Sequence, residues 1–229
     1  FEGRELQLGL TEPTRQNASH GLARWAAWTL EEHSPTSVSL QYRLMAQSGY
    51  PWVVDLHVLY DLSADGLTVT QTATNMSAEP APYASGAHPY LSGGPGPVDS
   101  WELTLPAATR SLTDERLLPV AREPVDGTPY DFRGGRALGT VQLDHAFTDL
   151  ERDADGVATV TLREPGSGSG VALWADARHR WFQVYSSDDA PAPFTRRAVA
   201  VEPMTAQADA FRTGEDLVTL TPAGSPGDE

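Results

Sequence analysis

The sequence predicts an all-β protein built as a large β-sandwich. Apolar and polar residues alternate with a period of two through several short segments, most clearly over 37–44 and 67–74. Turn-forming runs such as Asp65-Gly66 and Asp153-Ala-Asp-Gly156 separate such segments. No stretch has a convincing helical period, and only 205–211 could form about one turn of helix. Many short strands joined by turns are typical of a sandwich or a barrel.

The expected strands follow one another along the whole chain. Residues 1–10 alternate around Glu2-Gly3 and are expected to form one arm of a hairpin, so the numbering is expected to begin inside the domain, with upstream strands missing from it. Residues 107–139, rich in Pro, Gly and Arg, are expected to form a long ordered connection that could include short strands. With no linker and no repeat, we expect one domain over 1–229, with a frayed tail at 224–229. Further strands are expected over 37–44, 52–62, 67–74, 101–105, 157–162, 171–175, 181–185, 197–202 and 217–221.

Composition narrows the class of protein. The 229 residues, of which 40 % are apolar, can bury a sizeable core. The net charge of −15 disfavours binding to nucleic acid, and no apolar run is long enough to span a membrane. The chain has no cysteine, which excludes disulfides and thiolate metal sites and suits a cytoplasmic location. We expect a monomer or a weak dimer.

The first candidate for chemistry is Glu202. The apolar run Ala198-Val-Ala-Val201 leads directly into this carboxylate, and Pro203 is expected to end the strand there. Apolar surroundings disfavour the charged form of a carboxyl group, which raises its pKa toward values useful in proton transfer. The pattern alone is equally compatible with a solvated acid at a strand end.

The second candidate is His88. It stands between Gly86 and Pro89, with Tyr83 and Tyr90 on either side. The glycine permits close backbone approach and the aromatic rings offer an apolar wall, so His88 could act as an acid near neutral pH. A packed histidine that bonds a loop carbonyl would fit the same pattern.

Two further polar residues are weaker candidates. His20 precedes Gly21 in a turn, and Asp144 lies beside Leu143 and near Phe147, where it could accept hydrogen bonds from substrate hydroxyls. Each could equally be an ordinary surface or turn residue. No His-x-His or Glu-x-x-His spacing is present, so we expect neither a metal nor another cofactor.

Four short motifs occur along the chain in the order Asn17-Ala-Ser-His20-Gly21, Gly86-Ala-His88-Pro89-Tyr90, Leu143-Asp144-x-Ala-Phe147 and Val201-Glu202-Pro203-Met204-Thr205. Taken together and in this order, they resemble the motifs of the aldose 1-epimerase family, also known as galactose mutarotases. The resemblance covers essentially the whole chain. Residues His20-Gly-Leu-Ala-Arg24-Trp25 and Leu173-Trp-Ala-Asp176 look closest to a bacterial branch that includes sulfoquinovose mutarotase-like proteins.

The resemblance implies a fold, an activity and a set of site residues. The fold is the mutarotase β-supersandwich, and the activity is interconversion of the α- and β-anomers of a free aldose, a small-molecule sugar. Glu202 matches the general base, and His88 matches the general acid that protonates the ring oxygen. A substrate-binding Arg, usual in the family upstream of the residues numbered here, has no match at Arg4. The residues implied to bind the sugar are His20 and Asp144, with Asn17, Arg24 and Tyr90.

Three alternative functions remain open. The scaffold could be a non-catalytic carbohydrate-binding module. It could be a glycosidase that uses Asp144 and Glu202 as facing carboxyl groups. It could also serve an anionic sugar, a hexose phosphate or sulfoquinovose, held by Arg24, Arg178 or Arg180.

Overall fold

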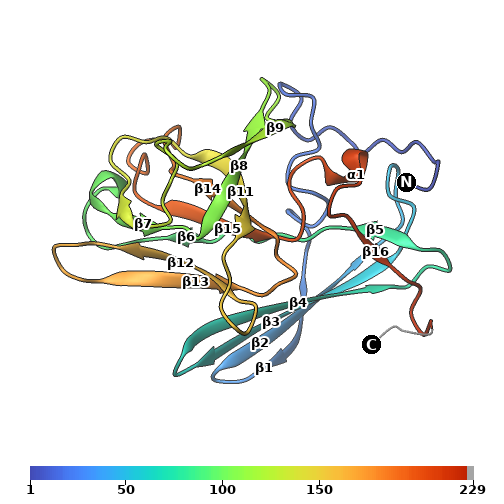
Figure 1. Cartoon of the computed structure of the whole chain (residues 1–229). Coiled ribbons are helices and arrows are strands. Elements are labelled where there is room, and N and C mark those ends of the chain that lie inside the picture. Colours follow the sequence, from blue (N-terminus) through green and yellow to red (C-terminus); the bar gives the residue numbers. More distant parts are fainter. Residues whose placement is uncertain (226–229) are drawn as a thin grey trace. The chain divides into compact units, whose positions relative to one another are not determined.

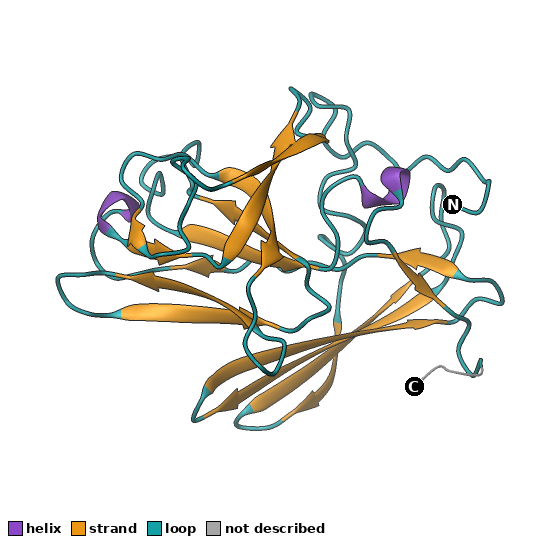
Figure 2. Cartoon of the chain, in the orientation of Figure 1, coloured by secondary structure: helices purple, strands orange, loops and turns teal. Residues whose placement is uncertain are grey.

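The structure, a computed structural model, describes residues 1–225 and is nearly all β, as predicted (Figures 1 and 2). The chain forms two compact units, an N-terminal unit of Phe1–Tyr83 with 218–225 and a central unit of Ala84–Leu217. Of the predicted frayed tail, Gly224 and Ser225 lie in a turn in which the Ser225 N–H donates to the Pro222 carbonyl (3.1 Å). Residues 226–229 of that tail lie outside the described residues.

The N-terminal unit contains an antiparallel meander whose strands pair in chain order, β1-β2-β3-β4. Trp52, Val54, Tyr50 and Ala81 form its buried cluster with Leu44. A second, two-stranded sheet pairs β5 with β16 and so joins the two chain segments that make up the unit. The strands of the unit are β1 (Thr29–His33), β2 (Ser37–Leu44), β3 (Val54–Ser63), β4 (Gly66–Asn75), β5 (Ala81–Tyr83) and β16 (Val218–Leu220).

The central unit is a sandwich of two antiparallel sheets. One sheet has the order β10-β7-β12-β13 and the other β6-β15-β14-β11-β8-β9. One buried apolar cluster holds Leu103 and Leu162 from the first sheet together with Phe147, Phe182 and Val201 from the second. The strands are β6 (Tyr90–Leu91), β7 (Glu102–Thr104), β8 (Ala107–Thr113), β9 (Pro119–Pro124), β10 (Arg136–Ala137), β11 (Asp144–Leu150), β12 (Ala158–Arg163), β13 (Gly170–Ala175), β14 (Trp181–Tyr185) and β15 (Val199–Met204).

Two local expectations are wrong, those for residues 1–10 and for the helical turn. Residues 1–10 contain no strand: alternation favours a strand only where a partner is available, and here the segment forms turns and loop. The expected connection over 107–139 does include short strands, β8, which pairs with β11, and β9, which pairs with β8. The helical turn lies at α1 (Ala210–Thr213), so it overlaps the expected 205–211 only at Ala210 and Phe211. A 3-10 turn also covers Val98–Ser100.

Pro203 does not end its strand, contrary to expectation, since β15 continues to Met204. The N–H and C=O of a strand residue point to the same side, and the Pro203 carbonyl accepts the Ala87 N–H (3.2 Å). The N–H that Pro203 lacks would therefore point away from β14. Pairing with β14 continues past the proline, as far as Trp181 opposite Met204.

No helix among residues 1–225 has both the length and the apolar character needed to cross a bilayer.

Candidate functional site

The site lies on the face of the six-stranded sheet that points away from the sandwich core. Side chains alternate between the two faces of a strand. Val199 and Val201 of β15 belong to the buried cluster, so Ala200 and Glu202 project from the opposite face. Glu202 is 8 % exposed and lies within β15, so it is a buried carboxyl group and not a solvated acid at a strand end.

Antiparallel pairing aligns further polar side chains on this face. Gln183 of β14 lies directly opposite Glu202, and Tyr185 lies opposite both Ala200 and Asp144. Tyr90 of β6 pairs with Ala200 from the other side. Tyr90, Ala200, Tyr185 and Asp144 therefore form one row across four strands, and Glu202 and Gln183 form the next row.

His88 and Glu202 are in direct contact, with 3.1 Å between the Nε2 atom of His88 and the Oε1 atom of Glu202. A bridge between Gly86 and Met204 aligns the two segments, and the Val201 N–H donates to the Pro89 carbonyl (3.2 Å). A Cβ at residue 86 would lie 3.2 Å from the Met204 Cγ, so a larger residue there would require the Met204 side chain to shift. The segment before β6 is thus held against β15, with its imidazole over the carboxyl group.

The environment favours a proton on Glu202. Burial, and then the negative charge of Asp144, raises the pKa of Glu202 to about 8. The carboxyl group and the imidazole can share one proton across their 3.1 Å contact. The arrangement can therefore take a proton from one oxygen and deliver one to a neighbouring oxygen.

Tyr90 packs against the imidazole rather than standing apart from it. Its ring is stacked on His88, with centroids 4.9 Å apart and an angle of 27° between the planes. Burial and the charges of Glu202, Asp189 and Asp144 raise the pKa of the Tyr90 hydroxyl, which therefore stays protonated and able to donate. Tyr90 is 54 % exposed, so its ring also borders solvent.

Two site residues escaped the sequence reasoning. The Gln183 side-chain amide donates to the Asp144 Oδ1 (2.7 Å) and so orients this carboxylate beside Glu202. The sequence did contain a signal for Gln183, because this polar residue alternates with the apolar residues Phe182 and Val184 and so should point to the other face of the strand. The second is Asp189, whose Oδ1 accepts the Tyr185 hydroxyl. Asp189 lies in a loop, where no periodicity could have identified it.

The remaining predicted binding residues belong to the N-terminal unit. His20 has a left-handed backbone (φ 58°), as does Gly21 (φ 68°), which agrees with the predicted turn. The Asn17 carbonyl accepts the Glu12 N–H (3.0 Å) in the preceding turn. The Arg24 guanidinium lies over the Trp25 ring, 4.9 Å from its centroid.

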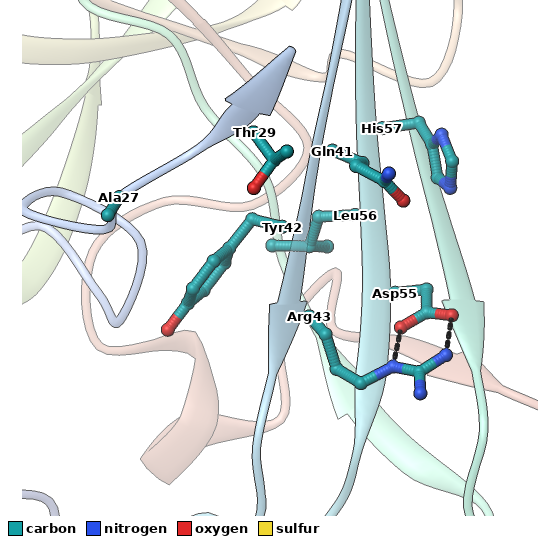
Figure 3. Close-up of a pocket in the computed structure, with 8 residues that line it drawn as sticks. All are labelled: Ala27, Thr29, Gln41, Tyr42, Arg43, Asp55, Leu56 and His57. Atoms are coloured by element: carbon teal, nitrogen blue, oxygen red, sulfur yellow. Dashed lines mark hydrogen bonds and ion pairs between the residues drawn. The ribbon is translucent and has the colours of Figure 1, made fainter. Parts of the chain in front are cut away.

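A separate hollow of about 320 Å³ opens on the meander sheet of the N-terminal unit (Figure 3). Its main polar feature is the pair Arg43 and Asp55, joined by two hydrogen bonds of 2.6 Å, as the dashed lines in Figure 3 show. None of the predicted site residues lines this hollow. Its lining is Ala27, Thr29, Gln41, Tyr42, Arg43, Asp55, Leu56 and His57.

Within residues 1–225, no group of three or more His, Asp or Glu side chains is placed to hold a metal ion.

Comparison with known proteins identifies the family. A family model described as aldose 1-epimerase matches residues 1–225. The chain belongs to the aldose 1-epimerase family. This epimerase-family chain is 33 % identical over 227 residues to the uncharacterized protein YihR of Escherichia coli K12, covering 99 % of this chain and 70 % of YihR. It is 26 % identical to the uncharacterized E. coli protein YphB, covering 100 % of this chain and 76 % of that protein.

Solved structures share the fold of this aldose 1-epimerase family member. A galactose mutarotase-like protein from Clostridium acetobutylicum superimposes with a TM-score of 0.80 at 16 % identity, over 97 % of this chain and 70 % of that one. A GalM/aldose epimerase homologue from C. elegans gives 0.74 at 22 % identity, over 87 % of this chain. The match spans 65 % of the C. elegans protein, so the chain corresponds to less than two thirds of its length.

Proposed function

We propose that this protein is an aldose 1-epimerase that interconverts the α- and β-anomers of a free aldohexose. The observation that carries the proposal is the 3.1 Å contact between the His88 Nε2 and the Glu202 Oε1 on a partly open sheet face. Mutarotation needs one proton removed from the anomeric hydroxyl and one delivered to the ring oxygen. Both oxygens are bonded to the same carbon, so an acid and a base in contact with each other have the spacing that the reaction requires.

Each proton is accounted for along the reaction. The ionised Glu202 takes the proton of the anomeric hydroxyl while the His88 imidazolium protonates the ring oxygen and the bond from C1 to that oxygen breaks. The open-chain aldehyde rotates about its C1–C2 bond. Glu202 then returns its proton to the aldehyde oxygen as the ring hydroxyl attacks C1 and gives its proton to His88. The side chains finish as they began, and the sugar has exchanged anomers.

Burial of Glu202 contributes to this chemistry. A carboxylate with a pKa of about 8 is a stronger base than a solvated one, and its charge is less well stabilised by water. The reactive state has the proton on His88, whereas the raised pKa favours the proton on Glu202. A sugar hydroxyl that donates to Glu202 would stabilise the ionised carboxylate and so shift the shared proton toward His88.

The polar groups beside the pair support a neutral sugar as substrate. Asp144, oriented by Gln183, can accept sugar hydroxyls. Two cations considered for an anionic substrate are already paired, Arg178 with Asp176 (3.0 Å) and Arg180 with Asp216 (2.6 Å). We therefore place D-glucose and D-galactose ahead of their phosphorylated or sulfonated analogues. His20, Asn17 and Arg24 remain proposed contributors from the N-terminal unit.

The deciding experiment is anomer exchange followed by NMR with D-glucose, D-galactose and 6-sulfo-D-glucose. We expect catalysed exchange of a neutral hexose in the wild-type protein. Binding of sugar without any catalysed exchange would instead indicate a carbohydrate-binding module, and exchange of the sulfonated sugar alone would indicate an anionic substrate. Release of reducing sugar from a glycoside would indicate a glycosidase.

A further inference from the structure

We propose that Tyr185 and Asp189 form a second recognition pair, which accepts a hydroxyl of the sugar one pleat along the sheet from the row of Glu202 and Gln183. The inference rests on the proposed function, since it concerns how the same site recognises its sugar. Neither residue belongs to the motifs that indicated the family.

The first step concerns the part of the sheet face that the sugar would contact. Ala200 is fully buried and lies between Tyr90 and Tyr185 in the cross-strand row. Adjacent strands are about 4.8 Å apart, so the strands that carry the two tyrosines are roughly 10 Å apart. Because Ala200 is completely covered, the surface that a sugar could reach here is made by the side chains on either side of it, Tyr90 and Tyr185, which project from the same face of the sheet.

The second step places Asp189 beside the two tyrosines. The Tyr185 hydroxyl donates to the Asp189 Oδ1, which draws the loop after β14 toward the row. The Asp189 charge also acts on Tyr90, on the other side of Ala200, and helps to raise the pKa of both tyrosines. Asp189 therefore lies within electrostatic range of both tyrosines that flank Ala200.

The third step concerns the hydrogen bonds that Tyr185 and Asp189 can still accept. The only proton of the Tyr185 hydroxyl is used by Asp189, so the tyrosine oxygen and the second carboxylate oxygen can only accept. Both match a hydroxyl donor, and sugars supply several. The neighbouring Asp188 differs, because Arg196 binds it at 2.6 Å and also binds Asp99 at 2.6 Å. Among the ion pairs of residues 1–225, none involves Asp189, which is exposed to solvent.

These features give Asp188 and Asp189 different tasks. Arg196 donates to the Gly139 carbonyl (2.7 Å) as well as to Asp188, and so anchors the loop between β14 and β15. Asp188 thus holds the loop in place, whereas Asp189 is exposed and bonded to Tyr185. A substrate that lacks the matching hydroxyl would leave Asp189 without a donor from the sugar, so we expect discrimination of about 10-fold to 100-fold in kcat/KM.

The test compares D-glucose and D-galactose with their 3-, 4- and 6-deoxy analogues in the wild type, Asp189→Ala and Tyr185→Phe. We expect the wild type to disfavour one deoxy sugar about 10-fold to 100-fold. Asp189→Ala should lower kcat/KM for the parent sugar, chiefly through KM, and leave that deoxy sugar unchanged, so that the ratio approaches one. Tyr185→Phe should give a smaller change of the same kind. Asp155→Ala, which removes an exposed turn carboxylate of the same unit, is the matched control.

An equal loss on every sugar, or no change on any, would overturn this role for Asp189. Dissociation constants from ligand-observed NMR give the same ratios without requiring turnover. If the wild type binds sugars with the expected dependence on one hydroxyl but exchanges no anomers, the recognition pair stands and the proposed function fails.

Discussion

The imidazole of His88 and the carboxyl group of Glu202 meet because the segment before β6 runs beside β15. Ala87 donates to the Pro203 carbonyl, and Val201 donates to the Pro89 carbonyl, each at 3.2 Å. These two backbone bonds flank the 3.1 Å contact between the side chains. The acid and the base are therefore positioned by main-chain pairing, which is more rigid than loop placement.

Glu202→Gln should abolish most of the activity. The amide keeps the size of the side chain and loses its basicity, so kcat/KM should fall about 10²-fold to 10⁴-fold. Polarimetry or anomer-exchange NMR measures the change. Glu151→Gln, at an exposed carboxyl of the same unit, should behave as the wild type. Near-wild-type exchange in Glu202→Gln would rule out this residue as the base.

The activity of the wild type should depend on pH with a bell shape. The active pair carries one proton, so the rate should rise as the doubly protonated pair loses its first proton and fall as it loses the second. In His88→Gln only the Glu202 carboxyl group remains, so the rate should rise once, as this group ionises near pH 8, and the alkaline fall should disappear. NMR exchange rates between pH 5 and 10, with His33→Gln as the control for an exposed imidazole, provide the measurement. Persistence of the alkaline fall in His88→Gln would remove His88 from the acid role.

The stability of the folded protein should also depend on pH, because the carboxyl group of Glu202 is buried. The folded pKa of Glu202, about 8, lies above its ordinary value of 4.5, so its contribution to stability is complete below about pH 4 and is lost as the pH rises through 8. The loss is about 5 kcal/mol, because the pKa differs between about 8 and 4.5 and each unit corresponds to about 1.4 kcal/mol.

Glu202→Gln cannot ionise, so it should unfold several degrees above the wild type at pH 9 and close to it at pH 5. Calorimetry at the two pH values measures this. An equal shift in Tm at both would show that ionisation of Glu202 is not the cause.

Tyr90 should act partly through His88. Tyr90→Phe keeps the ring that stacks on the imidazole at 4.9 Å, so we expect activity within a few-fold of the wild type. Tyr90→Ala removes the ring and its attraction for the imidazolium, which should lower kcat about 3-fold to 10-fold. If the phenylalanine variant is as impaired as the alanine variant, the hydroxyl matters rather than the stack.

The sequence was sufficient for the fold class because alternation is a local property. Every residue of the expected segment 37–44 is in β2, and 181–185 coincides with β14. The prediction from alternation failed over residues 1–10, where no partner strand is present, and it left the strands within 107–139 undecided, where β8 pairs with β9. Strand formation depends on neighbours that local sequence does not specify.

The residue types at the site were also readable from the sequence. Glu202 and His88 were chosen because a carboxylate after an apolar run and an imidazole between Gly and Pro suit proton transfer, and the family motifs supported the choice. Their contact, the burial that raises the pKa of Glu202, and the roles of Gln183 and Asp189 were decided by the tertiary structure. Register across β6, β15, β14 and β11 brings these side chains onto one face, and register arises only when distant strands pair.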